Sequence, residues 1–180
     1  MTKSRDIADS INRIDSSAAD ATAVTIDSSE RVLIPYQPSF QAIMPSSPST
    51  YDATNDTAVI STNFTQTFHN IGSHYNTSNG RFTAPVAGRY FFSGNVRWET
   101  AAFVQNSYIR LFISKNGGTF QTTELNQICG SNEAWNNYMN MTISGVLDLA
   151  ANDYVQLNGG LNGGTAKLHR EGSFTGHFLG

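Results

Sequence analysis

From about residue 32 to the end of the chain, apolar and polar residues alternate with a period of two, and Gly, Pro and Asn interrupt the pattern at short intervals. A period of two places successive side chains on opposite faces of an extended strand, so the pattern predicts β-strands that bury one face. The clearest example follows Gly88, where one face consists of Tyr90, Phe92, Val96 and Trp98. We therefore expect an all-β sandwich with this face in its core.

Further segments show the same alternation. Residues 108–113 carry apolar side chains on both faces, which predicts that one face lies in the core and the other meets another subunit. A second apolar face consists of Met139, Met141, Ile143, Leu147 and Leu149. Residues 150–153 have the composition of a turn, and Val155 and Leu157 resume the alternation after it. Residues 173–180 form the last expected strand.

Composition narrows the classes of partner. A length of 180 residues allows one domain with a modest extension, and a net charge of −3 without a Lys/Arg run offers no surface for nucleic acid. No apolar run is long enough to cross a bilayer or to serve as a signal peptide, so we expect no membrane insertion. A single cysteine cannot form an intrachain disulfide, so packing or assembly must hold the fold together.

The first 33 residues follow a different pattern. Ile7, Ile11 and Ile14 are spaced by four and three among charged residues, which predicts a narrow apolar stripe on a short helix over residues 2–15. Such a helix suits a three-stranded bundle or docking onto a larger body, and a frayed tail is the alternative. Residues 23–27 favour a short strand. We divide the chain into an attachment and linker segment, residues 1–33, and a head, residues 34–180.

Residues 64–92 resemble the signature of C1q/TNF-like domains, the family of the complement C1q globular head. The matching positions are Phe64, Asn70, Tyr75, Phe82, Gly88, Tyr90 and Phe92. The sequence departs from the family pattern at Gly94, where a further aromatic residue is usual, and this leaves the local packing open. The resemblance implies a ten-strand jelly roll that forms a homotrimer and recognises ligands through outer loops. Some C1q-like heads also bind calcium, so Asp153 could contribute an oxygen ligand; we assign no cofactor.

Two short strings in the first segment, residues 4–9 and 23–29, are similar to leader segments of tail-fibre and other appendage proteins of marine bacteriophages. The missing signal peptide and the missing collagen-like stalk agree with a virion protein that assembles in the host cytoplasm. The resemblance implies that Ile7, Ile11 and Ile14 attach the chain to other virion proteins.

Catalytic and metal-binding patterns are missing from the sequence. The four histidines lack a metal-site spacing, and there is no nucleophile elbow, phosphate loop or Cys/His pair. Asp148 and Asp153 flank a hairpin, where a role in the turn is favoured over acid–base chemistry. We therefore expect no enzymatic activity.

Candidate ligand-binding residues combine planar aromatic rings with amides, which suit stacking on sugars and hydrogen bonding to them. They are Trp135, Asn136, Asn137 and Tyr138, together with Asn158 and Asn162 in an expected loop over residues 158–164. The alternative is that Trp135 and Tyr138 begin a strand and pack inward.

The sequence thus predicts a trimeric bacteriophage virion appendage, such as a tail fibre or spike tip, whose head recognises a host surface glycan or protein. One alternative is a virion decoration or structural trimer without a receptor. The other is a cellular ligand-recognition protein of the C1q type.

Overall fold

The computed structural model describes residues 13–15, 22–46, 50–52, 58–102, 107–119, 125–131, 138–162 and 165–180. The chain divides into two compact units, Met1–Gln37 and Pro38–Gly180. The boundary expected from the sequence, between residues 33 and 34, lies shortly before this division. We call the units the N-terminal unit and the head, and describe each by itself.

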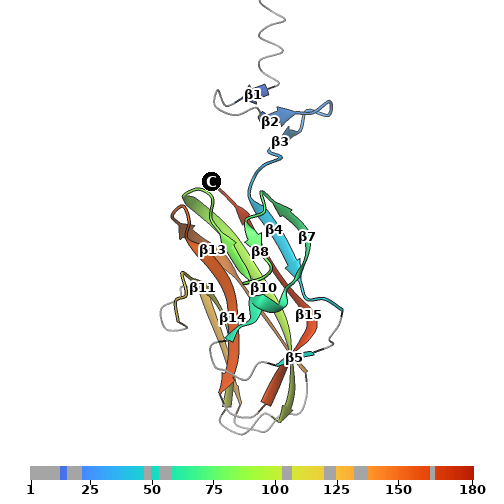
Figure 1. Cartoon of the computed structure of the whole chain (residues 1–180), viewed down its shortest axis with the longest axis vertical. Helices are drawn as coiled ribbons and strands as arrows, with labels where there is room; N and C mark the ends of the chain where they lie inside the picture. Colours follow the sequence, from blue (N-terminus) through green and yellow to red (C-terminus); the bar gives the residue numbers. More distant parts are fainter. Residues whose placement is uncertain are drawn as a thin grey trace, which may run out of the picture. The chain divides into compact units, whose positions relative to one another are not determined.

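The N-terminal unit contains a small antiparallel sheet of three strands in the order β1-β2-β3 (Figure 1). The strands are β1 (Arg13–Asp15), β2 (Thr22–Ile26) and β3 (Val32–Leu33). The strand expected over residues 23–27 is confirmed as β2. The helix expected over residues 2–15 is wrong at its end, because Ile14 lies in β1 opposite Val24. The neighbouring strand provides the hydrogen-bond partners that a marginal helix would have to find within itself. Ile7 and Ile11 lie outside the described residues.

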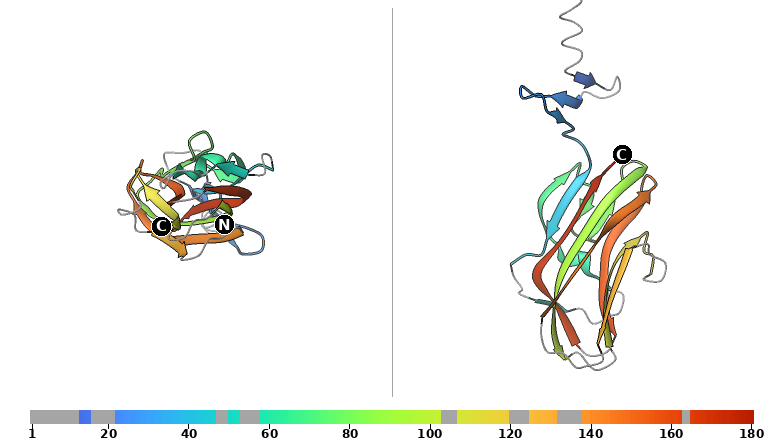
Figure 2. Two further views of the ribbon diagram at one scale, coloured as in Figure 1. Left: turned by 90° about the horizontal axis from the view of Figure 1, so that it is seen from below. Right: turned by 180° about the vertical axis from the view of Figure 1, so that it is seen from behind.

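The head consists of two six-stranded sheets whose paired strands are antiparallel (Figure 2). Sheet I has the order β13-β10-β15-β4-β7, with β5 beside β15; sheet II has the order β12-β11-β14-β9-β8, with β6 beside β14. The strands of sheet I are β4 (Ser39–Ile43), β5 (Thr50–Asp52), β7 (Gln66–Ile71), β10 (Gly88–Ala102), β13 (Tyr138–Leu149) and β15 (Thr165–Phe178). Those of sheet II are β6 (Ala58–Val59), β8 (Tyr75–Asn76), β9 (Arg81–Thr83), β11 (Ser107–Lys115), β12 (Leu125–Ser131) and β14 (Tyr154–Asn162), and the short 3-10 helix η1 (Ile60–Asn63) follows β6. The predicted all-β jelly-roll sandwich is confirmed, although the described residues of the head form twelve strands where the resemblance implied ten.

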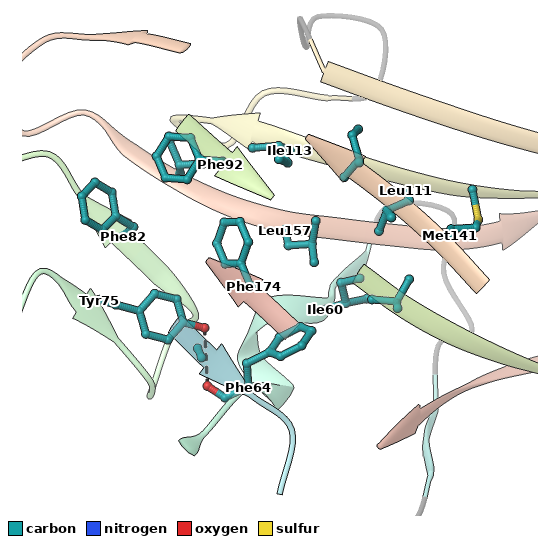
Figure 3. Packing of buried hydrophobic residues seen from close by; sticks show 14 of the residues in the cluster. Ile60, Phe64, Tyr75, Phe82, Phe92, Leu111, Ile113, Met141, Leu157 and Phe174 are labelled. Atoms are coloured by element: carbon teal, nitrogen blue, oxygen red, sulfur yellow. Dashed lines mark hydrogen bonds between the residues drawn. The ribbon is translucent and has the colours of Figure 1, made fainter. Parts of the chain in front are cut away.

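The core fills the space between the two sheets. The expected inner face of β10 is confirmed, because its four large side chains are completely buried: Tyr90, Phe92, Val96 and Trp98. Figure 3 shows Phe92 from sheet I and Ile113 and Leu157 from sheet II within one cluster. Burying so many large apolar side chains is the main source of stability in a sandwich of this size.

An aromatic cluster occupies the part of the core nearest β4 and β8. The rings of Phe40 and Tyr75 stack with centroids 4.5 Å apart, and Phe82 packs 5.2 Å from Phe40 and 5.6 Å from Phe92. The Tyr75 hydroxyl lies in an apolar surrounding but has a hydrogen-bond partner, because it donates to the Ser61 carbonyl oxygen at 3.0 Å. Stacked and edge-on rings at these separations stabilise a core beyond their buried area.

Gly94, the position that departs from the family pattern, has a packing explanation. A Cβ atom at Gly94 would lie only 2.5 Å from Cδ1 of Leu157 in the opposite sheet. Leu157 is completely buried and occupies the space that a larger side chain at residue 94 would need. The packing is therefore complete without an aromatic residue there.

Strand β11 differs from its expected role. Its inner face is buried as expected, but Phe112 on the other face is also only 1% exposed. The chain itself covers Phe112, so this side chain offers no surface to another subunit. Tyr108 and Arg110 on the same face are partly exposed, so the expected contact of this face with another subunit stays a prediction for these two residues.

Candidate functional site

The head has two different ends. At one end the chain enters at Pro38, whose carbonyl oxygen accepts a hydrogen bond from the Phe178 amide at 2.9 Å, and Figure 1 marks the C-terminus there. At the other end Tyr138 of β13 lies opposite Glu99 of β10, and Tyr108 of β11 lies opposite Asn162 of β14. We call this second end the distal end. Residues 103–106, 132–137 and 163–164 lie outside the described residues.

One polar cluster at the distal end lies on the outer face of sheet I. The Arg97 guanidinium carbon lies 3.9 Å from the centre of the Tyr138 ring, and Arg97 also forms an ion pair with Glu171. The His169 ring packs edge-on against Tyr138 with centroids 5.9 Å apart. Tyr138 is 49% exposed, so it begins a strand but does not pack inward. Three neighbouring strands thus hold one exposed aromatic ring in a fixed position.

A second polar cluster lies on sheet II at the same end. The Tyr108 hydroxyl accepts hydrogen bonds from Arg110 Nη2 at 2.7 Å and from Asn162 Nδ2 at 3.0 Å. The Arg110 guanidinium carbon lies 4.3 Å from the centre of the Tyr108 ring. Sequence reasoning proposed Asn162 but missed Tyr108 and Arg110. The alternating aromatic and basic residues were visible, but only the register between β11 and β14 brings them to Asn162.

Asn158 does not belong to this surface. It lies in β14 and is only 5% exposed, and its Oδ1 accepts a hydrogen bond from Ser114 Oγ at 2.7 Å. The loop expected over residues 158–164 is therefore wrong up to Asn162. The prediction interpreted Gly159 as part of a flexible loop. In the structure a Cβ atom at residue 159 would lie 2.9 Å from the Arg110 carbonyl oxygen, so the neighbouring strand leaves no room for a side chain. This glycine allows close packing of strands and does not mark a flexible loop.

Trp135, Asn136 and Asn137 lie outside the described residues, and their role in binding stays a prediction. Strand β12 ends before them at Ser131, and strand β13 begins after them at Tyr138. Both of these strand ends lie at the distal end of the head.

The outer face of sheet I carries mostly short, uncharged polar side chains in its middle. Asn95 lies opposite Thr142 and Ser173, and in the next row Ser93 lies opposite Ser144 and Thr175. Nearer the end that holds the C-terminus one row of this face is apolar, with Val146 at 45% exposure, and the charged pair Arg89 and Asp148 follows it. The ring of Phe91 packs there against His177, 5.2 Å between centroids. Such a face can approach another protein surface closely.

Asp153, the residue considered for calcium, is engaged in the turn between β13 and β14. It accepts hydrogen bonds from Asn116 Nδ2 at 2.7 Å and from the Ala150 amide at 2.8 Å, and it pairs with Lys115 Nζ at 2.9 Å. The hydrogen bonds from Asn116 and Lys115 lower the pKa of Asp153 from 3.8 to about 2. Asn152 beside it has the left-handed conformation that the turn composition suggested, with φ of 71°.

Neither a metal cluster nor a membrane-spanning helix is found in the part of the chain that the structure describes. No group of three or more His, Cys, Asp or Glu side chains among these residues could hold a metal ion. None of their helices is long and apolar enough to span a bilayer. Calcium binding stays a prediction without an assigned site.

Comparisons with known proteins agree with this architecture. The model of the C1q domain family matches residues 46–179, which is most of the chain. Among solved structures, the chain is similar to the globular domain of zebrafish complement 1qA protein, with a TM-score of 0.54 and 18% identity over 80% of this chain and 98% of that one. No curated protein matches the sequence. The family match covers every strand of the head except β4, and on that basis the chain belongs to the C1q domain family.

Proposed function

We propose that this protein is a non-enzymatic recognition protein that acts as a homotrimer, with the distal end of the head as its binding surface. The observation that carries the proposal is the arrangement of the head, in which an exposed aromatic ring of sheet I and an exposed amide of sheet II lie at the end opposite the chain entry. The chain enters the head at Pro38, so attachment through the N-terminal unit does not use the residues of the distal end.

The outer face of sheet I supports self-association. Its middle rows consist of short uncharged side chains such as Ser93, Asn95 and Thr142, and the apolar row beside them exposes Val146. Homotrimers are general among C1q domains. A cyclic trimer through this face would present three distal ends together, so that weak individual contacts add up to firm attachment.

Host-surface glycans or proteins are the ligand class that we propose. Tyr138 offers an exposed ring, and Asn162 is an exposed amide at the end of β14. A ring that stacks on a sugar and an amide that bonds to its hydroxyls are a common combination in carbohydrate sites. Trp135, Asn136 and Asn137 would extend this surface.

We further propose that the protein is a bacteriophage virion appendage, a tail fibre or spike tip that is assembled in the host cytoplasm. The support is the resemblance of residues 4–9 and 23–29 to leader segments of such proteins. Ile7 and Ile11 would contact other virion proteins. A virion decoration without a receptor remains the second candidate, since the same trimer and attachment segment would serve it.

Binding of the purified full-length protein to host cells tests the recognition role. The change Tyr138→Ala combined with Asn162→Ala should reduce cell binding at least tenfold, because it removes the exposed ring and the amide. The matched control is Val86→Ala, a side chain with 47% exposure in the loop before β10, at the chain-entry end. Its binding should equal that of the unchanged protein.

Light scattering on the same samples distinguishes a loss of receptor binding from a loss of the trimer. We expect three times the chain mass for all three proteins. Cells that bind none of them would favour the decoration role, while a monomeric mass for the unchanged protein would contradict the trimer.

A further inference from the structure

The N-terminal unit concentrates exposed apolar side chains. No side chain from Val24 to Gln37 is buried, and this part of the chain is described without gaps. Among the described residues, half of the exposed large apolar side chains lie between residues 26 and 36. They are Ile26 at 39% exposure, Val32 at 64%, Leu33 at 43%, Ile34 at 49% and Tyr36 at 64%. An apolar concentration of this kind on a folded protein usually marks an interaction site.

The small sheet cannot account for its own stability. Its strands have three, five and two residues, and no second layer of described residues within the unit covers either face. Sheets of this size need a further packed surface to be stable in water. The exposed apolar residues are therefore the surface that must be covered when this unit is ordered.

Apolar side chains occur on both faces of the small sheet. Ile26 lies directly opposite Val32, so these two side chains share one face. Leu33 follows Val32 in β3 and lies opposite Thr25, so it belongs to the other face. Contacts around a cyclic ring join two different faces of each copy, whereas a twofold dimer needs only one. The two-sided distribution therefore fits a ring.

Charge excludes several other occupants. Asp27 and Arg31 pair with each other across the turn, with Arg31 Nη2 2.6 Å from Asp27 Oδ2. From Val32 to Gln37 the chain has no charged residue. A neutral apolar surface offers nothing to a nucleic acid or to an acidic or basic partner.

We propose that Ile26, Val32, Leu33, Ile34 and Tyr36 form a neck that packs against the necks of the other copies of this chain. The inference rests on the proposed homotrimer. The N-terminal unit ends at Gln37 and β4, a strand of sheet I, begins at Ser39, so the two are joined almost without a linker. Heads that associate through sheet I would hold the necks at a high effective concentration, which favours contacts too weak to form alone.

The test measures dissociation of the full-length protein on dilution. Val32→Asp combined with Ile34→Asp places two charges on the neck, and Ser28→Asp combined with Ser29→Asp places the same charges on the exposed turn beside it. We expect the neck variant to dissociate at a concentration at least about tenfold higher than the turn variant and the unchanged protein. Far-ultraviolet circular dichroism should show the same β-content in all three, since all four altered side chains are exposed.

The outcomes separate the neck from the head. A neck variant that is trimeric but dissociates more easily supports both associations. A neck variant that is monomeric at every concentration supports the neck and contradicts association through sheet I. If both variants dissociate equally, the neck contact between copies is overturned and the head trimer is unaffected. If they dissociate equally but the neck variant no longer incorporates into the particle, the exposed apolar surface binds another protein, and the neck contact is overturned as well. A monomeric unchanged protein contradicts both.

Discussion

The head and the N-terminal unit are both antiparallel β-structure with apolar residues in every strand, yet only the head buries them. In the head, sheet II covers the inner face of sheet I, and Tyr90 and Trp98 are completely buried. In the N-terminal unit no second layer of described residues covers the small sheet, and Val32 is 64% exposed. The comparison shows that apolar strands stabilise a fold only where a second layer packs on them and removes their side chains from water. The head should therefore be stable by itself and the N-terminal unit should depend on assembly.

The largest effect should come from the core of the head. Phe92→Ala removes a completely buried ring between Phe82 and Phe174, and we expect a loss of about 3–5 kcal/mol in unfolding free energy. Phe91→Ala, the next residue on the outer face of the same strand, is the matched control and should cost clearly less. Urea unfolding of both variants checks the difference, and equal losses would mean that the two faces are not distinct.

The next effect tests how tightly the two sheets of the head pack. Gly94→Ala introduces a methyl group 2.5 Å from Leu157 Cδ1, which we expect to cost about 1–3 kcal/mol. In a Leu157→Ala background the same change should be nearly neutral, because the conflicting side chain is gone. A double-mutant cycle of unfolding free energies measures this coupling. Additive losses would show that Leu157 is not the residue that limits the space at position 94.

Acid should weaken the head through Asp153 before it affects the apolar core. Its pKa is lowered from 3.8 to about 2 in the folded protein, so its contribution to stability is complete above about pH 4 and is lost as the pH falls toward 2. Thermal unfolding of the unchanged protein and of Asp153→Asn should differ at pH 7 and converge near pH 2. A difference that persists at pH 2 would contradict this role of the carboxylate.

The smallest effect should follow loss of most of the N-terminal unit. Deleting residues 1–30 removes no member of the core cluster, whose first residue is Phe40. We expect the melting temperature of the head to change by less than about 2 °C, with incorporation into the particle lost. Calorimetry and particle assembly measure the two effects. A head that unfolds on deletion would show that the two units are one cooperative structure.

Much of the head could be predicted from the sequence because its strands alternate regularly. The inner faces of β10 and β13 follow directly from a period of two, which is a local property of the chain. Errors arose where tertiary pairing overrides local patterns. Ile14 fits a helical stripe but pairs with Val24, and Gly159 looks like a loop residue but lies against β11.

The candidate site was harder to predict for the same reason. Asn162 was found as an amide near an expected loop, but Asn158 from the same stretch is buried beside Ser114. Tyr108 and Arg110 join Asn162 only through the register of β11 with β14. Strand pairing decides which polar residues lie together at one end of a sandwich. Strands that pair although they are far apart in sequence leave no local signal of that pairing.

The position of β15 in sheet I has a consequence for synthesis on the ribosome. β15 lies between β10 and β4, and it pairs with both. While the chain is growing, β4 and β7 emerge early but cannot join β10 until residues 165–178 have left the exit tunnel. The nascent head must therefore keep its β4 and β7 edge strands apart from those of neighbouring chains until β15 emerges, and only then can sheet I be completed.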